Sequence, residues 1–214
     1  LGWGNSGGAY QAHQIADNHP GLLDGVVVSQ SFPDMVSGVL PVITDALLLR
    51  EYTAAHPDRL TREQQLAVSG FRRRESIDLL EGRARRIDPR GVCRPDLTEE
   101  DLYHRERHPE GARCEVFAAG ANVYGTDPET DRPLRPLDNV GVQYGLGALL
   151  DGVLDVDMFL HLNEHVGGVD ADGRVVSERT EADPRATAAA HRSGRLLHGG
   201  AGLADVPTVG HRFS

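Results

Sequence analysis

The chain has 214 residues, of which 39% are hydrophobic and 25% charged, which is enough for one domain with a buried core. Its 22 basic and 32 acidic residues give a net charge of −10, and this acidic balance argues against a nucleic-acid-binding surface. No apolar run approaches the length of a membrane-spanning helix, so we expect neither a nucleic-acid partner nor a membrane span.

The first motif is Gly4-Asn5-Ser6-Gly7-Gly8, which fits the G-x-S-x-G pattern of a nucleophile elbow. In such an elbow a serine lies on a sharp turn between a buried strand and a helix. Glycines on both sides of the serine allow a turn that leaves no room for a β-carbon. The pattern predicts Ser6 as a catalytic nucleophile and the Gly7 amide as a donor of an oxyanion hole. A glycine-rich loop before an ordinary helix is the alternative.

The next elements supply the context that an elbow needs. Apolar residues recur at helical spacing over residues 9–16, and Asn-His-Pro-Gly at residues 18–21 is a helix stop. Three valines at residues 26–28 are typical of a strand buried on both faces. The following residues would lie at the carboxyl edge of the sheet, where catalytic groups gather. Asp34 is therefore a candidate triad acid, and the cap of a helix beginning near Met35 is the alternative.

These residues resemble those of known hydrolases. In α/β-hydrolases a segment runs from the nucleophile elbow to the next strand of the sheet. This segment is similar to the stretch GNSGGAYQAHQIADNHPGLLDGVVVSQSFPD. A closer resemblance, to a bacterial hydrolase-like family known mainly as a domain of unknown function and often secreted, also includes GARCEVFAAGANVYGTDPETDRPLRPLDNVGVQYGL and FLHLNEHVGGVDADGRVVSERTEADP. The resemblance covers most of the chain and is weakest at residues 51–94. It implies an ester-hydrolase fold and leaves the substrate open.

The expected fold class is α/β, with part of an α/β-hydrolase parallel sheet and a helical lid insertion. Residues 1–50 would form the elbow, its helix and the next strand of the core, and residues 51–135 the lid. Residues 136–214 would return to the core and be truncated at their end. The sequence begins directly before the elbow, without the upstream strands that usually precede it, so we expect an internal fragment of a hydrolase domain.

Several local elements are predicted in the middle of the chain. Asp45 lies inside an apolar run, and is either a second acid in an unusual setting or a helix cap. Thr61 and Gln64 match a capping box. Residues 115–118 and 122–124 suggest short strands.

The two cysteines, Cys93 and Cys114, lie on either side of an acidic, proline-bounded segment. Two cysteines cannot form a structural zinc site alone. A disulfide is the favoured interpretation and would suit an extracellular or periplasmic location. Two free thiols are the alternative.

The last third of the chain alternates helices with turns. Helices are predicted over residues 140–150, 156–165 and 184–193, and a strand begins near residues 206–209. Residues 169–176 predict a hairpin around an Asp-Gly turn. The same residues contain the D-x-D-G beginning of a calcium loop, but the later ligand positions of that loop are not met.

The first functional hypothesis is hydrolysis of a carboxylic ester, small or oligomeric, through an acyl-enzyme on Ser6 and without a cofactor. A histidine takes the proton of the serine and an acid orients the histidine. The order along α/β-hydrolases is serine, acid, histidine, so the base must come late. His211 is the candidate base and Asp34 the candidate acid. Alternatively, the base and the acid lie beyond residue 214, and this segment alone is inactive.

Two further hypotheses come from other classes. His161, Glu164 and His165 match H-x-x-E-H, in which two histidines one helical turn apart bind zinc and the glutamate is the general base of a peptidase. A third ligand would have to be a residue such as Glu178 or Glu181, and polar histidines on an exposed helix are the alternative. The third hypothesis is a hydrolase-like scaffold that binds without turnover.

Overall fold

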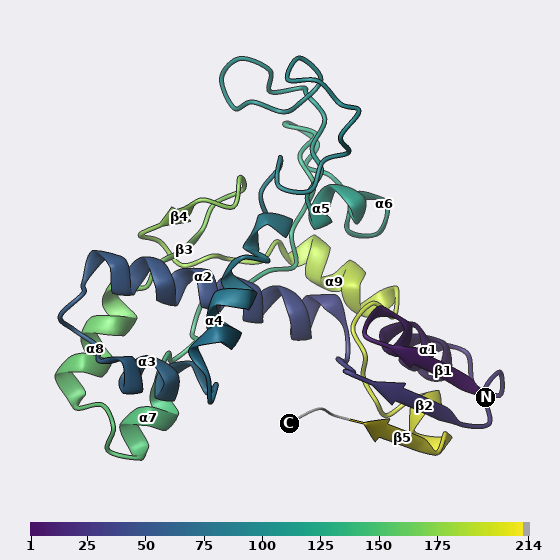
Figure 1. Ribbon diagram of the computed structural model, residues 1–214. Coiled ribbons are helices and arrows are strands. Elements are labelled where there is room, and N and C mark those ends of the chain that lie inside the picture. Colours follow the sequence, from purple (N-terminus) through teal and green to yellow (C-terminus); the bar gives the residue numbers. More distant parts are fainter. Residues whose placement is uncertain (212–214) are drawn as a thin grey trace.

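The computed structural model describes residues 1–211 and contains a small parallel sheet beside a larger helical region (Figure 1). The sheet has the strand order β1 (Gly2–Asn5), β2 (Val26–Ser29), β5 (Thr208–His211), and all of its pairs are parallel. Helix α1 (Gly7–Asn18) connects β1 to β2. The predicted α/β class with a parallel sheet is confirmed, and β5 returns to the sheet from the far end of the chain.

One face of the sheet is covered by α1. Ala9, Ala12 and Ala16 of the helix pack against Val26 and Val28, and all five side chains are at most 5% exposed. Small alanine side chains let the helix lie close to the strands, so this core is tight but small.

The opposite face of the sheet carries a row of exposed apolar side chains. Trp3, Val27 and Val209 are paired in register across the three strands and are 83%, 37% and 65% exposed. Among residues 1–211 no element covers this row. The prediction that the 26–28 strand is buried on both faces is therefore wrong for Val27.

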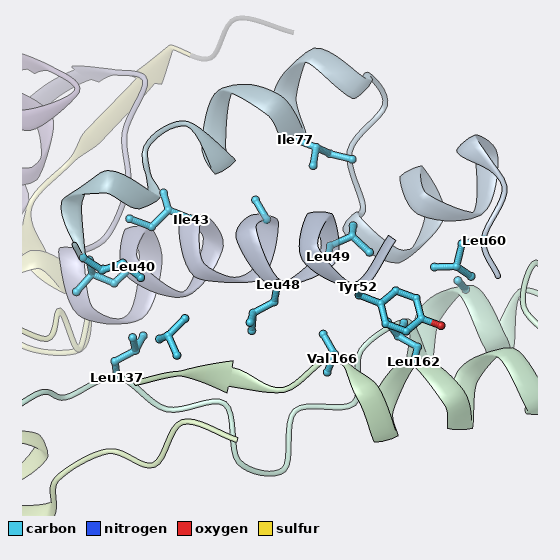
Figure 2. Packing of buried hydrophobic residues seen from close by; sticks show 14 of the residues in the cluster. Leu40, Ile43, Leu48, Leu49, Tyr52, Leu60, Ile77, Leu137, Leu162 and Val166 are labelled. Atoms are coloured by element: carbon cyan, nitrogen blue, oxygen red, sulfur yellow. The ribbon is translucent and has the colours of Figure 1, made fainter. Parts of the chain in front are cut away.

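Helix α2 (Leu40–Ala55) is the centre of the helical region. It is preceded by a π-helical turn (Met35–Val39) and is apolar on nearly all sides, as expected for a helix surrounded by others. Figure 2 shows Ile43 and Leu49 on one side of α2 and Leu48 on the other. The surrounding helices are α3 (Arg62–Ser69), α4 (Arg74–Glu81), η2 (Ala84–Arg86), α7 (Leu146–Leu150) and α8 (Val156–His165).

Two local predictions in this region have clear outcomes. Asp45 lies within the second turn of α2, so its assignment as the cap of a helix beginning at residue 46 is wrong. The capping box of α3 is confirmed, because Thr61 Oγ1 accepts from Gln64 N and Gln64 Oε1 accepts from Thr61 N. No helix among residues 1–211 is long and apolar enough to cross a membrane.

The segment between η2 and α7 is mostly irregular and holds two short helices, α5 (Val116–Ala119) and α6 (Ala121–Tyr124). The predicted strands at residues 115–118 and 122–124 are therefore wrong. The backbone groups are paired locally instead, since the Ala119 amide donates to Glu115 O and the Gly125 amide to Ala121 O. A strand would need a neighbouring strand to supply these partners.

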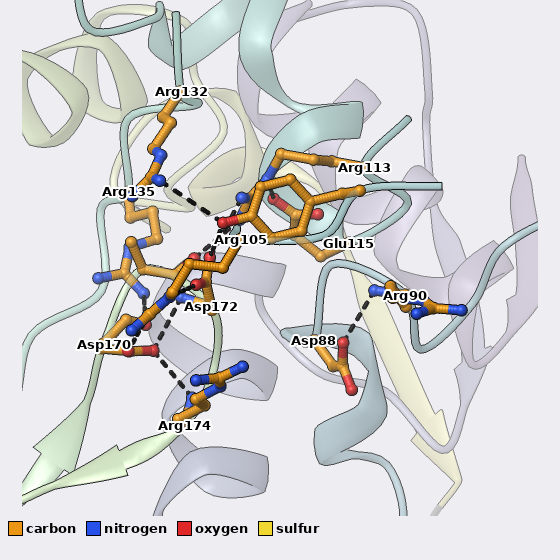
Figure 3. Close-up of polar contacts among 12 residues, drawn as sticks. Asp88, Arg90, Arg105, Arg113, Glu115, Arg132, Arg135, Asp170, Asp172 and Arg174 are labelled. Atoms are coloured by element: carbon orange, nitrogen blue, oxygen red, sulfur yellow. Dashed lines mark hydrogen bonds and ion pairs between the residues drawn. The ribbon is translucent and has the colours of Figure 1, made fainter. Parts of the chain in front are cut away.

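A disulfide and a charged network hold this irregular segment. Cys93 and Cys114 form the expected disulfide, with Cα atoms 4.9 Å apart. The guanidinium of Arg113 donates to Glu115 at 2.9 Å and to Asp172 at 3.2 Å, and Arg105 pairs with the same aspartate (Figure 3). The segment is thereby tied to the part of the chain around Asp172.

The last third of the chain matches its predicted elements with one exception. The hairpin is formed by β3 (Gly168–Val169) and β4 (Val175–Val176), and α9 (Pro184–Arg192) and η3 (Gly202–Asp205) follow. The helix predicted over residues 140–150 begins only at Leu146. Gly141 and Gly145 both have φ of +79°, which is outside the right-handed helical region.

Candidate active site

The backbone of Ser6 forms the sharp turn that the sequence predicts. Ser6 lies between the last residue of β1 and the first residue of α1, with φ 51° and ψ −115°. A positive φ is costly for a residue with a β-carbon and persists only where the surrounding structure holds it. The Ser6 side chain is exposed at this turn.

The glycine requirement of the turn falls mainly on one residue. A β-carbon at Gly4 would lie 2.2 Å from the carbonyl carbon of Gly8 and 2.7 Å from the amide nitrogen of Ala9. A β-carbon at Gly7 or at Gly8 would meet nothing within 4 Å. The expectation of a steric need on both sides of the serine is therefore right for Gly4 and wrong for Gly8.

Hydrogen bonds tie the turn to the neighbouring strand. The Ser6 amide donates to Ser29 O at 3.0 Å, and Ser29 Oγ donates to Asn5 Oδ1 at 2.8 Å. Gly7 is the first residue of α1, where an amide has no acceptor within the helix. Within residues 1–211 neither the Gly7 amide nor Ser6 Oγ has a hydrogen-bond partner, so both are open to a ligand.

His211, the candidate base, lies at the same edge of the sheet as the serine. It ends β5 and is paired with Ser29, which is paired in turn with Asn5. Neighbouring strands are about 4.8 Å apart, so the Cα atoms of Asn5 and His211 are separated by roughly 10 Å. The His211 side chain is exposed.

Asp34, the candidate acid, is fully buried and caps the π-helical turn that begins at Met35. Its Oδ1 accepts from the Ser37 amide at 2.6 Å, and its Oδ2 accepts from Ser37 Oγ at 2.8 Å and from the Leu197 amide at 3.2 Å. Both oxygens are therefore used within the fold, and none of these partners is a histidine. The predicted capping geometry is present.

A second histidine near this edge was not singled out from the sequence. His13 of α1 is 9% exposed, and its Nδ1 lies 3.4 Å from Oγ of Ser31, which follows β2. His13 follows Ala9 by four residues and therefore lies on the same, buried face of the helix. This spacing is the sequence signal that could have predicted a buried histidine here. Beside this pair, the rings of Tyr10 and Phe32 stack with centroids 5.7 Å apart.

The histidines of the H-x-x-E-H motif lie in the helical region, on α8. The rings of His161 and His165 stack with centroids 4.1 Å apart, and His56 at the end of α2 lies 4.8 Å and 5.3 Å from them. His161 Nδ1 bonds Tyr52 Oη at 2.9 Å. Loss of solvent lowers the pKa of His161, and the positive charge of Arg59 lowers it further.

The motif does not form a ready zinc site. The side chain of Glu164 is 75% exposed, and His165 Nδ1 bonds the backbone carbonyl of His161 at 2.9 Å. In the part of the chain that the structure describes, no group of three or more His, Cys, Asp or Glu is arranged to hold a metal ion. The predicted i, i+4 placement of the two histidines on one helix face is confirmed, and it serves a ring stack.

Comparison with known proteins identifies a matching family. The model of a family described as "Tannase-like family of unknown function (DUF6351)" matches residues 1–214. No curated protein and no solved structure matches the chain. Tannase is an α/β-hydrolase esterase, which agrees with the parallel sheet and the sharp turn at Ser6. Since the match spans the whole sequence, the chain belongs to the tannase-like family of unknown function.

Proposed function

We propose that this chain carries the nucleophile of a serine hydrolase that cleaves carboxylic esters. Ser6 Oγ attacks the carbonyl carbon, the alcohol leaves, and the acyl group remains on Ser6 until water releases it as the acid. The observation that carries the proposal is the backbone of Ser6, which has φ 51° at a strand-to-helix turn and an exposed side chain. Membership of a tannase-like family supports it.

The surroundings of Ser6 favour the charge that develops in this reaction. The oxygen of the attacked carbonyl becomes an oxyanion, and the Gly7 amide has no other acceptor among the described residues. Gly7 also begins a helix of 12 residues, whose amino end favours negative charge. We assign Gly7 as one donor of the oxyanion hole.

For the base we propose His211. It lies at the carboxyl edge that also holds Ser6, whereas both carboxylate oxygens of Asp34 already have partners in Ser37 and Leu197. Asp34 can therefore orient a histidine only if these hydrogen bonds rearrange. The assignment of Asp34 as the acid is weaker than that of His211 as the base. His211→Gln should lower ester turnover by at least about a hundredfold if the imidazole is the general base. A variant with full turnover would show that another group takes the proton.

We propose that residues 51–135 are an insertion into a hydrolase core formed by residues 1–50 and 136–214. All three strands of the parallel sheet come from residues 1–50 and 136–214, and none from residues 51–135. This pattern supports an insertion, which we propose as the lid. The Cys93–Cys114 disulfide fits an oxidising compartment, so we propose an extracellular or periplasmic location and an ester substrate, small or oligomeric, met there.

The test is labelling of the full-length protein with a fluorophosphonate probe, followed by mass spectrometry to locate the adduct. We expect modification of Ser6 and its loss in Ser6→Ala. Ser31→Ala is the matched control, because Ser31 follows the neighbouring strand and has His13 beside it. An adduct on Ser31, or labelling that survives Ser6→Ala, would show that the nucleophile is wrongly assigned.

A further inference from the structure

The helical region contains a pocket of its own, formed away from the turn at Ser6. It has a volume of about 140 Å³ and is enclosed mainly by side chains of α2, α3, α4 and α8. In Figure 1, α3 and α8 lie on the side of the molecule away from β1 and α1. Its apolar lining includes Val42, Ala46, Leu49, Phe71, Leu162 and Val166.

Three polar residues, Asp45, Ser69 and Tyr144, also line this pocket. The Ser69 hydroxyl already donates to Leu66 O and accepts from the Phe71 amide. The Tyr144 hydroxyl donates to Asp45 Oδ1 at 2.7 Å and accepts from Asn139 Nδ2 at 3.1 Å. The single hydroxyl proton of the tyrosine is thus already used. Among residues 1–211 no donor reaches Asp45 Oδ2, and this oxygen is not closed off from solvent. A ligand in the pocket shields this oxygen from water, so a ligand with a donor is favoured over one that leaves the oxygen unpaired.

The charges nearby favour a neutral donor over a cation. Burial raises the pKa of Asp45, while the Tyr144 hydrogen bond and the positive charge of Arg179 lower it. The Arg179 guanidinium lies 5.0 Å from the centre of the Tyr144 ring and donates to Asn163 O at 2.9 Å. The Asp45 carboxylate therefore already has the positive charge of Arg179 close by. An ammonium ligand would add a second positive charge that nothing in the pocket balances.

We propose that this pocket binds a small neutral alcohol of about the size of phenol. The ring packs against the apolar lining, and the hydroxyl donates to Asp45 Oδ2. The volume suits this size, because an apolar cavity of about 150 Å³ holds benzene. The site is independent of Ser6 and of the proposed esterase reaction.

The first test titrates the purified protein with phenol, toluene and cyclohexylamine by calorimetry. We expect saturable one-to-one binding of phenol, with a dissociation constant on the order of 1 mM for so small a ligand. Toluene, which has nearly the same shape without the donor, should bind at least about tenfold more weakly. Asp45→Asn should remove this preference, because the amide no longer offers an ionised acceptor. A cyclohexylamine affinity above that of phenol would overturn the neutral-donor assignment.

The second test blocks the pocket from its exposed side. Val42 lines the pocket and is 37% exposed, so Val42→Phe places a larger side chain at the site with little risk to the core. Val153, which is 36% exposed and outside the pocket lining, gives the matched control Val153→Phe. Phenol binding should be lost in the first variant and kept in the second. Unchanged binding in Val42→Phe, or no saturable phenol binding in the unmodified protein, would overturn the proposal.

Discussion

The parallel sheet and the helical region differ in how completely they are covered. Helix α2 is packed on both sides, with Ile43 and Leu48 fully buried, whereas the sheet has α1 on one face and the exposed side chains of Trp3 and Val209 on the other. The proposed chemistry belongs to the less covered region. The turn at Ser6 is therefore held by local backbone geometry and hydrogen bonds, while the larger buried core lies among the helices.

The largest effect should come from opening the helical core. Leu48→Ala removes a fully buried side chain and should lower the free energy of unfolding by about 2–5 kcal/mol. Leu160→Ala on α8 is the control, because Leu160 is 58% exposed and should change stability by less than about 0.5 kcal/mol. Denaturant unfolding followed by circular dichroism measures both. Equal losses in the two variants would refute the dominance of this core.

The disulfide should contribute next. Cys93 and Cys114 are 21 residues apart, and a crosslink over a loop of this size stabilises a fold by about 3 kcal/mol. Replacing both cysteines by serine should lower the unfolding free energy by this amount, and a reducing agent should do the same to the unmodified protein. If reduction also abolished labelling of Ser6 in an otherwise folded protein, the two regions would be coupled more tightly than we infer.

At the turn itself, the two glycines before and after Ser6 should behave differently. Gly4→Ala forces a β-carbon against the Gly8 backbone and should cost about 1–3 kcal/mol, with loss of fluorophosphonate labelling. Gly7→Ala adds a β-carbon that meets nothing within 4 Å, so it should preserve stability. The comparison uses thermal unfolding and probe labelling together. Tolerance of Gly4→Ala in both assays would mean that the turn adopts another geometry.

The two faces of the sheet should differ by a smaller amount. Val28 is 2% exposed and lies under α1, so Val28→Ala should lower stability by about 1.5 kcal/mol. Val209 is 65% exposed, and Val209→Ala should cost less than about 0.5 kcal/mol. A large loss for Val209→Ala in the full-length protein would show that something covers the exposed row.

The smallest effect concerns the pH dependence of the helical region. Burial raises the pKa of Asp45 in the folded protein above its unfolded value. Between these two pKa values the folded state binds more protons than the unfolded state, so it loses stability as pH rises through this range. Asp45→Asn lacks this titration. The stability of the variant relative to the unmodified protein should therefore increase between pH 4 and pH 7, as measured by denaturant unfolding. A decrease over this range would contradict the raised pKa.

Features set by neighbouring residues could be predicted from the sequence. The turn at Ser6, the capping box at Thr61 and the hairpin at residues 169–176 each depend on a few adjacent side chains or glycines, and all three are present. The strands expected at residues 115–118 and 122–124 failed because a strand depends on a partner that the pattern does not name.

Contacts between distant residues could not be predicted. The Asp45–Tyr144 hydrogen bond joins residues 99 positions apart, and Tyr52 meets His161 across 109 positions. Nothing in the local pattern pairs them, since helix packing alone brings them together. His211 could be named from its late position in the chain, but its place at the edge of the sheet that holds Ser6 depends on β5 pairing with β2, which no local pattern indicates.

The exposed row on the sheet also supplies a natural optical reporter. Trp3 is the only tryptophan in the sequence, it is 83% exposed, and it lies in the strand that leads directly into Ser6. Its fluorescence should show the long-wavelength emission of an indole in water. Any chain segment, partner or large substrate that covers this face would move the emission to shorter wavelength, so a single unlabelled spectrum can follow events beside the proposed nucleophile.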